Sequence, residues 1–174
     1  MSLIKFPFDE VPGLLSPTDR HTLMELSDAC SPLEGQYVEI GSWIGASALC
    51  ILEGMPMEKS LWAFDFFYEL QRFDEHLISA GFSNRTIVCK GDFRQTWPVV
   101  ESNLKQVAFA FVDHDHAIAT TETAYMFLWP RLVSRGILAF HDYGHSDYPQ
   151  ATEYLGALSH RLSINEGIIS FQKP

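Results

Sequence analysis

The chain is poor in positive charge. Its 174 residues include 12 Lys and Arg against 22 Asp and Glu, which gives a net charge of −10 at pH 7. A nucleic-acid-binding surface needs a basic footprint to displace counterions from phosphates, so we expect no nucleic-acid partner. The same balance gives no support to attraction by an anionic membrane.

The sequence also lacks a long apolar run at its N-terminus and a metal-type cysteine motif. The first dozen residues contain one lysine and two prolines, which predicts neither a signal peptide nor a transmembrane span. Cys30, Cys50 and Cys89 are an odd number without ligand spacing, and their apolar or helical context favours buried free thiols. Such cysteine usage is typical of a reducing cytoplasm, where we expect the protein.

The length and composition predict one domain over residues 1–174, with 47% hydrophobic and 20% charged residues. We divide it into an N-terminal segment and helix, 1–34, and a core, 35–174. The start at Lys5–Phe8 is irregular. A helix start follows at Ser16, because its side chain can accept from an orphan amide, Pro17 suits the first helical position, and Asp19 complements the helix dipole.

Short apolar runs then alternate with longer helical segments. The predicted strands are Tyr37–Ile40, Leu61–Phe64, Thr86–Cys89, Val107–Val112 and Ile137–Phe140. The predicted helices are Ala46–Leu52, Tyr68–Ala80 (ended by Gly81), Arg94–Leu104, Thr120–Ser134 and Gln150–Ser159. This alternation predicts an α/β, doubly wound, Rossmann-like sheet with helices on both faces.

The C-terminal tail breaks this pattern. Leu162–Ile164 and Ile168–Phe171 flank the turn Asn165-Glu166-Gly167, which is typical of an antiparallel hairpin. The complete prediction is a seven-stranded, mostly parallel sheet closed by that hairpin.

A glycine-containing turn joins the first strand to its helix. Gly41 in Glu39-Ile40-Gly41-Ser42 allows a tight turn and a close approach to a ligand, and Gly45 allows close packing of helix and strand. The spacing Glu-x-Gly-x-x-x-Gly differs from the Gly-x-Gly-x-x-Gly of pyrophosphate binders. The turn therefore indicates either a binding site for a polar group or a purely structural βα connection.

Acidic residues follow successive strands. Asp65 ends the second strand 24 residues after Gly41, where an acid would bond the hydroxyls of a ribose. Asp92 follows the third strand, where it could meet an adenine amine. Either residue alone could be an ordinary loop aspartate, but a series of acids at strand ends favours a cofactor site.

Two Asp/His clusters follow the fourth and fifth strands: Asp113-His114-Asp115-His116 and His141-Asp142-Tyr143-Gly144-His145. Because the carboxyl ends of parallel strands meet at one edge of the sheet, we expect both clusters in one pocket. There they could hold a metal, move a proton, or both.

These segments together resemble the class I S-adenosylmethionine-dependent methyltransferases. The chain is most similar to the small bacterial branch related to macrocin-type sugar O-methyltransferases and cephalosporin-hydroxylase-like proteins. The likeness covers about Gly35 to Tyr143, and order and spacing both fit. It is carried by Val38–Ser47, Ala63–Asp65, Phe111–His116 and Trp129–Tyr143.

The resemblance implies S-adenosylmethionine as cofactor and distributes its parts along the chain. The turn from Glu39 to Gly45 would hold the methionine part, Asp65 the ribose and Asp92 the adenine, with Asp113 beside the sulfonium. The full implied cofactor set is Glu39, Gly41, Ser42, Gly45, Ser47, Asp65, Phe66, Asp92, Phe93 and Asp113.

The resemblance also implies a divalent metal and a general base. Asp113 and Asp142 match two Mg²⁺ ligands of metal-dependent relatives, whereas His141 stands where those relatives carry a carboxylate. Imidazole is a poor ligand for Mg²⁺ and a better one for Mn²⁺, Fe²⁺ or Zn²⁺. Either the metal differs, His141 points away, or no metal binds. Asp115 or His116 would be the base, unless Asp115 caps the next helix and His116 packs beside it.

The expected function is O-methylation of a small polar acceptor such as a sugar or glycan precursor. A metal-dependent hydrolase built on the Asp/His clusters is an alternative, and so is a non-catalytic module that binds S-adenosylmethionine. Because the chain has little material for a substrate lid, a homodimer partner could complete the pocket.

Overall fold

The fold is built on one sheet, which the computed structural model describes within residues 11–174; the irregular start predicted at 5–8 lies outside these residues. Strand order is β3-β2-β1-β4-β5-β7-β6, parallel except for β7, which runs antiparallel to both β5 and β6. The seven-stranded, mostly parallel sheet with a C-terminal hairpin is thus confirmed. The strands are β1 Gln36–Ile40, β2 Leu61–Asp65, β3 Thr86–Lys90, β4 Val107–Val112, β5 Leu132–Phe140, β6 Arg161–Asn165 and β7 Ile168–Gln172.

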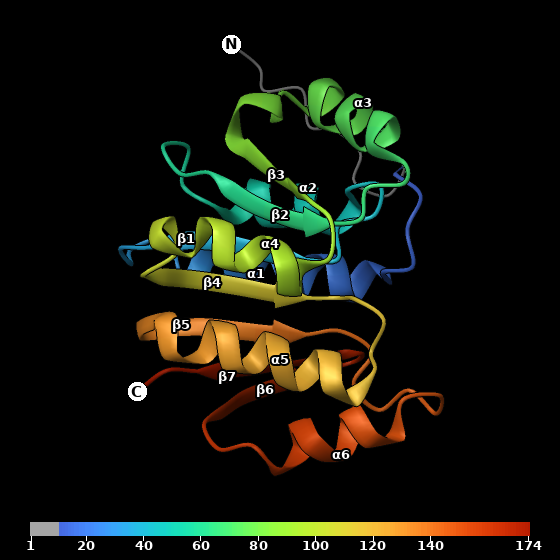
Figure 1. The fold of residues 1–174 in the computed structure, drawn as a ribbon, viewed down its shortest axis with the longest axis vertical. Coiled ribbons are helices and arrows are strands. Elements are labelled where there is room, and N and C mark those ends of the chain that lie inside the picture. Colours follow the sequence, from blue (N-terminus) through green and yellow to red (C-terminus); the bar gives the residue numbers. More distant parts are fainter. Residues whose placement is uncertain (1–10) are drawn as a thin grey trace.

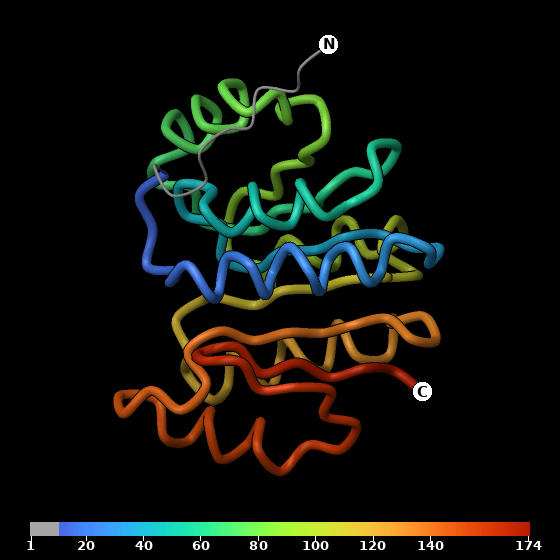
Figure 2. Tube along the Cα trace, turned by 180° about the vertical axis from the view of Figure 1, so that it is seen from behind, coloured from blue at the N-terminus to red at the C-terminus, as the bar shows by residue number. Residues whose placement is uncertain are grey.

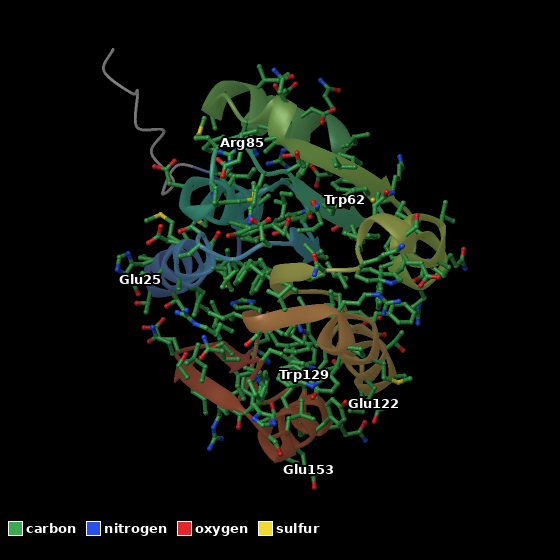
Figure 3. All side chains as sticks on the ribbon, turned by 90° about the vertical axis from the view of Figure 1, so that its left-hand side faces the viewer. Glu25, Trp62, Arg85, Glu122, Trp129 and Glu153 are labelled. Atoms are coloured by element: carbon green, nitrogen blue, oxygen red, sulfur yellow. The ribbon has the colours of Figure 1, made fainter. Side chains whose placement is uncertain are left out.

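Helices cover both faces of this sheet, as Figures 1 and 2 show from opposite sides. Helices α1 (Pro17–Ala29), α2 (Ala46–Gly54) and α3 (Leu70–Ala80) bury their apolar side chains in one core cluster. Helices α4 (Phe93–Val100), α5 (Ile118–Leu128) and α6 (Pro149–Ala157) do so in the other. Figure 3 shows the layers edge on, with Glu25 of α1 and Glu122 of α5 on opposite sides of the sheet.

Local signals placed several element ends correctly. Ser16 is the N-cap of α1, where its hydroxyl accepts from the Asp19 amide and the Asp19 carboxylate accepts from the Ser16 amide. This reciprocal pair is a capping box. Gly81 ends α3 in the left-handed conformation, with φ of 79°. The three cysteines are buried and none of them forms a disulfide in the described part of the chain, as predicted.

The bounds of all five predicted core helices differ from the structure, by up to two residues at either end for α2 and α6 and by more for α4 and α5. The helix predicted at Thr120–Ser134 ends at Leu128, and β5 already begins at Leu132 after a 3-10 turn. Pro130 lies in that turn, and a proline inside a helix removes one hydrogen bond and clashes with the preceding turn. The helix predicted at Arg94–Leu104 is α4 followed by a 3-10 turn at Glu101–Asn103, and α3 begins two residues after Tyr68.

The topology places the candidate site between β1 and β4. The chain winds from β1 outward to β3 and then crosses back to β4, on the other side of β1. Strands β1 and β4 therefore form the switch point, where open α/β sheets bind ligands. Within residues 11–174, none of the helices combines the length and the apolar character that crossing a membrane requires.

Candidate active site

Gly41 closes the switch point by bringing two strand ends into direct contact. It has a φ of 94°, and a Cβ atom added to it would lie 1.7 Å from the carbonyl oxygen of Asp113. The Gly41 amide donates to Phe64 O of β2 at 2.8 Å, and the Asp113 amide donates to Ile40 O at 2.8 Å. Only glycine fits between these strand ends, so Gly41 fixes the distance between β1 and β4.

The Asp65 carboxylate organises the turn after β1. Its Oδ2 accepts from the backbone amides of Ser42 and Trp43, both at 2.8 Å, and its Oδ1 accepts from the Phe67 amide at 2.9 Å. The sequence left open a polar-group site or a structural connection at this turn, and two of its backbone amides bind the Asp65 side chain. The residue predicted to meet a ribose therefore also holds the turn in place.

Glu39 lies beneath the same turn, fully buried, and lines neither of the two cavities described below. Ser42 Oγ donates to its Oε2 at 2.5 Å, while Oε1 has no hydrogen-bond partner among the described residues. Burial raises the pKa of Glu39 to about 8, although the Ser42 hydrogen bond acts in the opposite direction. Ser47 acts in the same direction as Ser42, but burial dominates, so the carboxyl group is largely protonated near neutral pH.

A cavity of about 260 Å³ opens on the β2 and β3 side of the switch point. Its walls are partly aromatic, with Phe66 and Phe93 among them, and the Phe93 ring lies parallel to that of His114 at a centroid distance of 6.1 Å. Asp92 also lines it, but Arg94 Nη2 donates to Asp92 Oδ2 at 2.5 Å and, with the Arg94 amide, lowers the pKa of Asp92. The predicted adenine-side residues thus share one cavity.

A second cavity, of about 330 Å³, lies on the β4 and β5 side and includes the segment before α1. It is lined by Gly13, Leu14 and Leu15 and by Trp43, whose side chain is half exposed. The two cavities have a common wall, which consists of Gly41, Asp65, Asp113, His114 and Asp115. Two ligands bound side by side would therefore meet at this wall.

Both Asp/His clusters converge on the second cavity, as expected. The carboxylates of Asp113 and Asp142 and the imidazole of His141 offer three ligand atoms that lie within 4.8 Å of one another. His141 Nδ1 is 3.3 Å from Asp113 Oδ1 and 3.5 Å from Asp142 Oδ1. The side chain of His141 therefore points toward the two acids and not away from them.

The charge around His141 controls its protonation. Burial lowers the pKa of His141, but the hydrogen bond with Asp113 and the charges of Asp113, Asp142 and Asp19 outweigh this and raise it to about 9. Without a metal the imidazole is thus a cation among three carboxylates. A metal at Nδ1 has to displace that proton.

His116 and Asp115 differ in how they are held. His116 Nε2 lies 3.2 Å from Asp142 Oδ2 and 3.5 Å from Asp113 Oδ1, and its ring packs on Tyr148. Asp115 accepts from the Ala117 amide at 3.1 Å and from Thr120 Oγ1 at 3.2 Å at the start of α5. Asp115 therefore contributes to the helix start, while still lining both cavities.

His114 was not among the predicted site residues. Its side chain is only 10% exposed, its Nδ1 accepts from the His116 amide at 2.9 Å, and its Nε2 has no partner among the described residues. Burial lowers the pKa of His114 to about 4, so the ring is neutral at pH 7. The only signal in the sequence is its position between Asp113 and Asp115, directly after a buried strand.

Residues 38–143 match the family described as "Methyltransferase domain". The chain belongs to this methyltransferase family. The match includes the glycine turn, Asp65, Asp92 and both acids of the candidate metal site, and it confirms the resemblance to class I methyltransferases. A search of curated protein sequences finds no significant match.

Solved structures show the same methyltransferase fold. The O-methyltransferase from Bacillus cereus, in complex with SAH, has a TM-score of 0.74 at 14% identity, over 91% of this chain and 82% of that one. A putative O-methyltransferase from Klebsiella pneumoniae has a TM-score of 0.75 at 14% identity, over 94% and 84%. The TDP-rhamnose 3′-O-methyltransferase of calicheamicin biosynthesis has a TM-score of 0.69 at 20% identity, over 89% and 78%.

Proposed function

We propose that this methyltransferase transfers the methyl group of S-adenosylmethionine to a hydroxyl group of a small polar acceptor, such as a sugar or glycan precursor. The observation that carries the proposal is the wall shared by the two cavities at Gly41, Asp65 and Asp113. A cofactor with its adenosine part in the first cavity and its methionine part along Ser42 and Ser47 would meet an acceptor in the rest of the second cavity, at this wall. The B. cereus complex with SAH and the sugar methyltransferase of similar fold support this assignment.

The cofactor would be held along the ends of β1 to β4. The Glu39–Gly45 turn with Ser47 would receive its methionine part, Asp65 and Phe66 its ribose, and Asp92 and Phe93 its adenine. Glu39, buried beneath the turn with its Oε1 unpartnered among the described residues, would support this end of the site.

Methyl transfer from a sulfonium is an in-line displacement, in which the new O–C bond forms as the S–C bond breaks. The enzyme has to align the acceptor oxygen behind the methyl group and accept the hydroxyl proton. His116, held between Asp113 and Asp142, is our first candidate for the base, and Asp115 is the second. Alignment of the cofactor and the acceptor at the shared wall would supply much of the rate acceleration.

A divalent metal would be held by Asp113, His141 and Asp142. Two carboxylates and one imidazole within 4.8 Å fit a transition metal such as Mn²⁺, Fe²⁺ or Zn²⁺ better than Mg²⁺. When bound, the metal would lower the pKa of an acceptor hydroxyl. The chain's own contribution is to hold the three ligand atoms and keep His116 beside them.

Among the alternatives, no finding supports a metal-dependent hydrolase. The family match spans the glycine turn together with both Asp/His clusters up to Tyr143, which favours a cofactor site over a structural turn. A non-catalytic binding module would have the same cavities, so only a measurement of turnover distinguishes it from an enzyme. A cytoplasmic location and a homodimer stay predictions.

Calorimetry tests the cofactor. S-adenosylmethionine and SAH would be titrated into the wild type, Gly41→Val and Asp65→Ala, with and without Mg²⁺ or Mn²⁺. We expect binding by the wild type and a large loss in both variants, and no binding by the wild type would refute the proposal. Transfer of a labelled methyl group to free sugars, sugar nucleotides and phenols then tests activity. Cofactor binding without turnover on any acceptor would favour the binding module.

A further inference from the structure

Helix α1 places the buried carboxylate of Asp19 next to Nε2 of His141. Asp19 is 5% exposed and His141 is 7% exposed, and Asp19 Oδ2 lies 3.5 Å from His141 Nε2. The same oxygen accepts from the Ser16 amide at 3.1 Å, and the other oxygen, Oδ1, has no partner among the described residues. Asp19 is therefore both the third residue of a capping box and a neighbour of the candidate metal site.

The hairpin turn encloses this pair. A Cβ atom on Gly167 would lie 3.6 Å from His141 Nε2 and 3.8 Å from Asp19 Oδ1. On either side, Ser16 Oγ donates to Glu166 Oε2 at 2.8 Å and Asn165 Nδ2 donates to Thr22 Oγ1 at 2.7 Å. Helix α1 and the β6–β7 turn are thus joined around the two side chains, which fixes the distance between them.

The two nitrogens of the His141 ring face opposite partners. Nδ1 faces Asp113 and Asp142, while Nε2 faces Asp19. In metal sites, a ligating histidine commonly donates its second N–H to a carboxylate, which fixes the tautomer and the orientation of the ring. With Nε2–H directed at Asp19, the lone pair of Nδ1 is the one available to a metal between Asp113 and Asp142.

We propose that Asp19 is the positioning residue of the metal site: it accepts the Nε2 hydrogen of His141 so that Nδ1 serves as the ligand. This rests on the metal site of the proposed function. It extends that site to the N-terminal helix, whose preceding residues Gly13–Leu15 line the acceptor cavity. Residues that contact the acceptor and the residue that orients the metal ligand thus belong to one segment.

The test compares Asp19→Asn with Ser16→Ala. Asparagine retains an oxygen for the Ser16 amide but removes the charge that faces His141. Ser16→Ala removes the other half of the capping box and the Glu166 contact without touching His141. Mn²⁺ affinity is measured by calorimetry for the wild type and both variants, together with SAH affinity and the thermal midpoint of each.

We expect Asp19→Asn to weaken Mn²⁺ binding by about tenfold or more, the effect usual for such outer-shell partners, with SAH affinity unchanged. Ser16→Ala should change Mn²⁺ affinity by less than about twofold, even if it lowers the thermal midpoint as much as Asp19→Asn does. Equal Mn²⁺ affinity in Asp19→Asn and the wild type would overturn the proposal. So would an equal loss in both variants, or no Mn²⁺ binding by the wild type. Failure of the wild type to bind SAH would instead count against the proposed function.

Discussion

The acids at the ends of β2 and β3 and those at the ends of β4 and β5 occupy equivalent positions in the sheet but have different partners. Asp65 binds three backbone amides, and Asp92 binds an arginine. Asp113 and Asp142 face imidazole rings from His116 and His141.

This difference separates two tasks within one edge of the sheet. Backbone amides do not titrate, so the first region is a fixed surface suited to shape and hydrogen-bond recognition. Imidazoles can transfer protons and bind metals, so the second region is suited to chemistry. Gly41 joins the two regions, so a single substitution there should damage both.

The largest effect is expected for Gly41→Ala. The new Cβ atom would overlap Asp113 O in a left-handed backbone, so the ends of β1 and β4 must separate. We expect a loss of at least about 3 kcal/mol of unfolding free energy and of all SAH binding. Urea unfolding and calorimetry measure the two. The control is Gly81→Ala, which has a similar φ and no atom within 4 Å, and should cost about 1 kcal/mol and leave SAH binding intact.

His116→Gln should separate chemistry from binding. Loss of the base between Asp113 and Asp142 is expected to reduce single-turnover methyl transfer by about 10² to 10⁴, with SAH affinity within a few-fold of the wild type. The matched control is His145→Gln, because the His145 side chain is half exposed and pairs with Asp147, and its only link to Asp142 among the described residues is a backbone hydrogen bond that the variant keeps. An equal loss of turnover in both variants would contradict the assignment of His116.

Asp65→Ala and Asp142→Ala should have opposite effects on the two ligands. Removing three charge-assisted hydrogen bonds from the turn should lower SAH affinity by at least about tenfold and spare Mn²⁺ binding. Asp142→Ala removes a metal ligand, so it should weaken Mn²⁺ binding and spare SAH affinity. Calorimetry with both ligands on both variants gives four values, and exposed Asp74→Asn serves as the control. If each variant lost both ligands equally, the division into two regions would be wrong.

The most gradual effect is a pH dependence of stability. Because the pKa of Glu39 is about 8 in the folded protein against an ordinary value of 4.5, the fold binds a proton that the unfolded chain has lost between these values. The contribution of this proton to the free energy of unfolding is complete below pH 4.5 and is lost as the pH rises to about 8. Stability of Glu39→Gln relative to wild type should therefore rise by about 1 kcal/mol per pH unit across this window. Urea unfolding at several pH values measures it, and a constant difference would contradict a buried neutral carboxyl.

Much of the fold follows from local signals in the sequence. Ser16 and Gly81 placed helix ends because capping needs only neighbouring residues. Apolar runs placed the strands, and Asn165-Glu166-Gly167 placed the hairpin. The end of α5 was missed, since the helical pattern continued past Pro130 into residues that pair with β4. Pairing with a distant strand decided that boundary.

The sequence by itself determined which side chains reach the functional edge, because alternation of strands and helices fixes where every parallel strand ends. Tertiary structure alone decided what those side chains bind. Asp65 turns to the amides of another loop, His141 lies between acids from three segments, and Asp19 joins them from a helix 122 residues earlier in the chain. Hydrogen bonds and charge pairs act over a few ångströms in space, and sequence spacing does not report those distances.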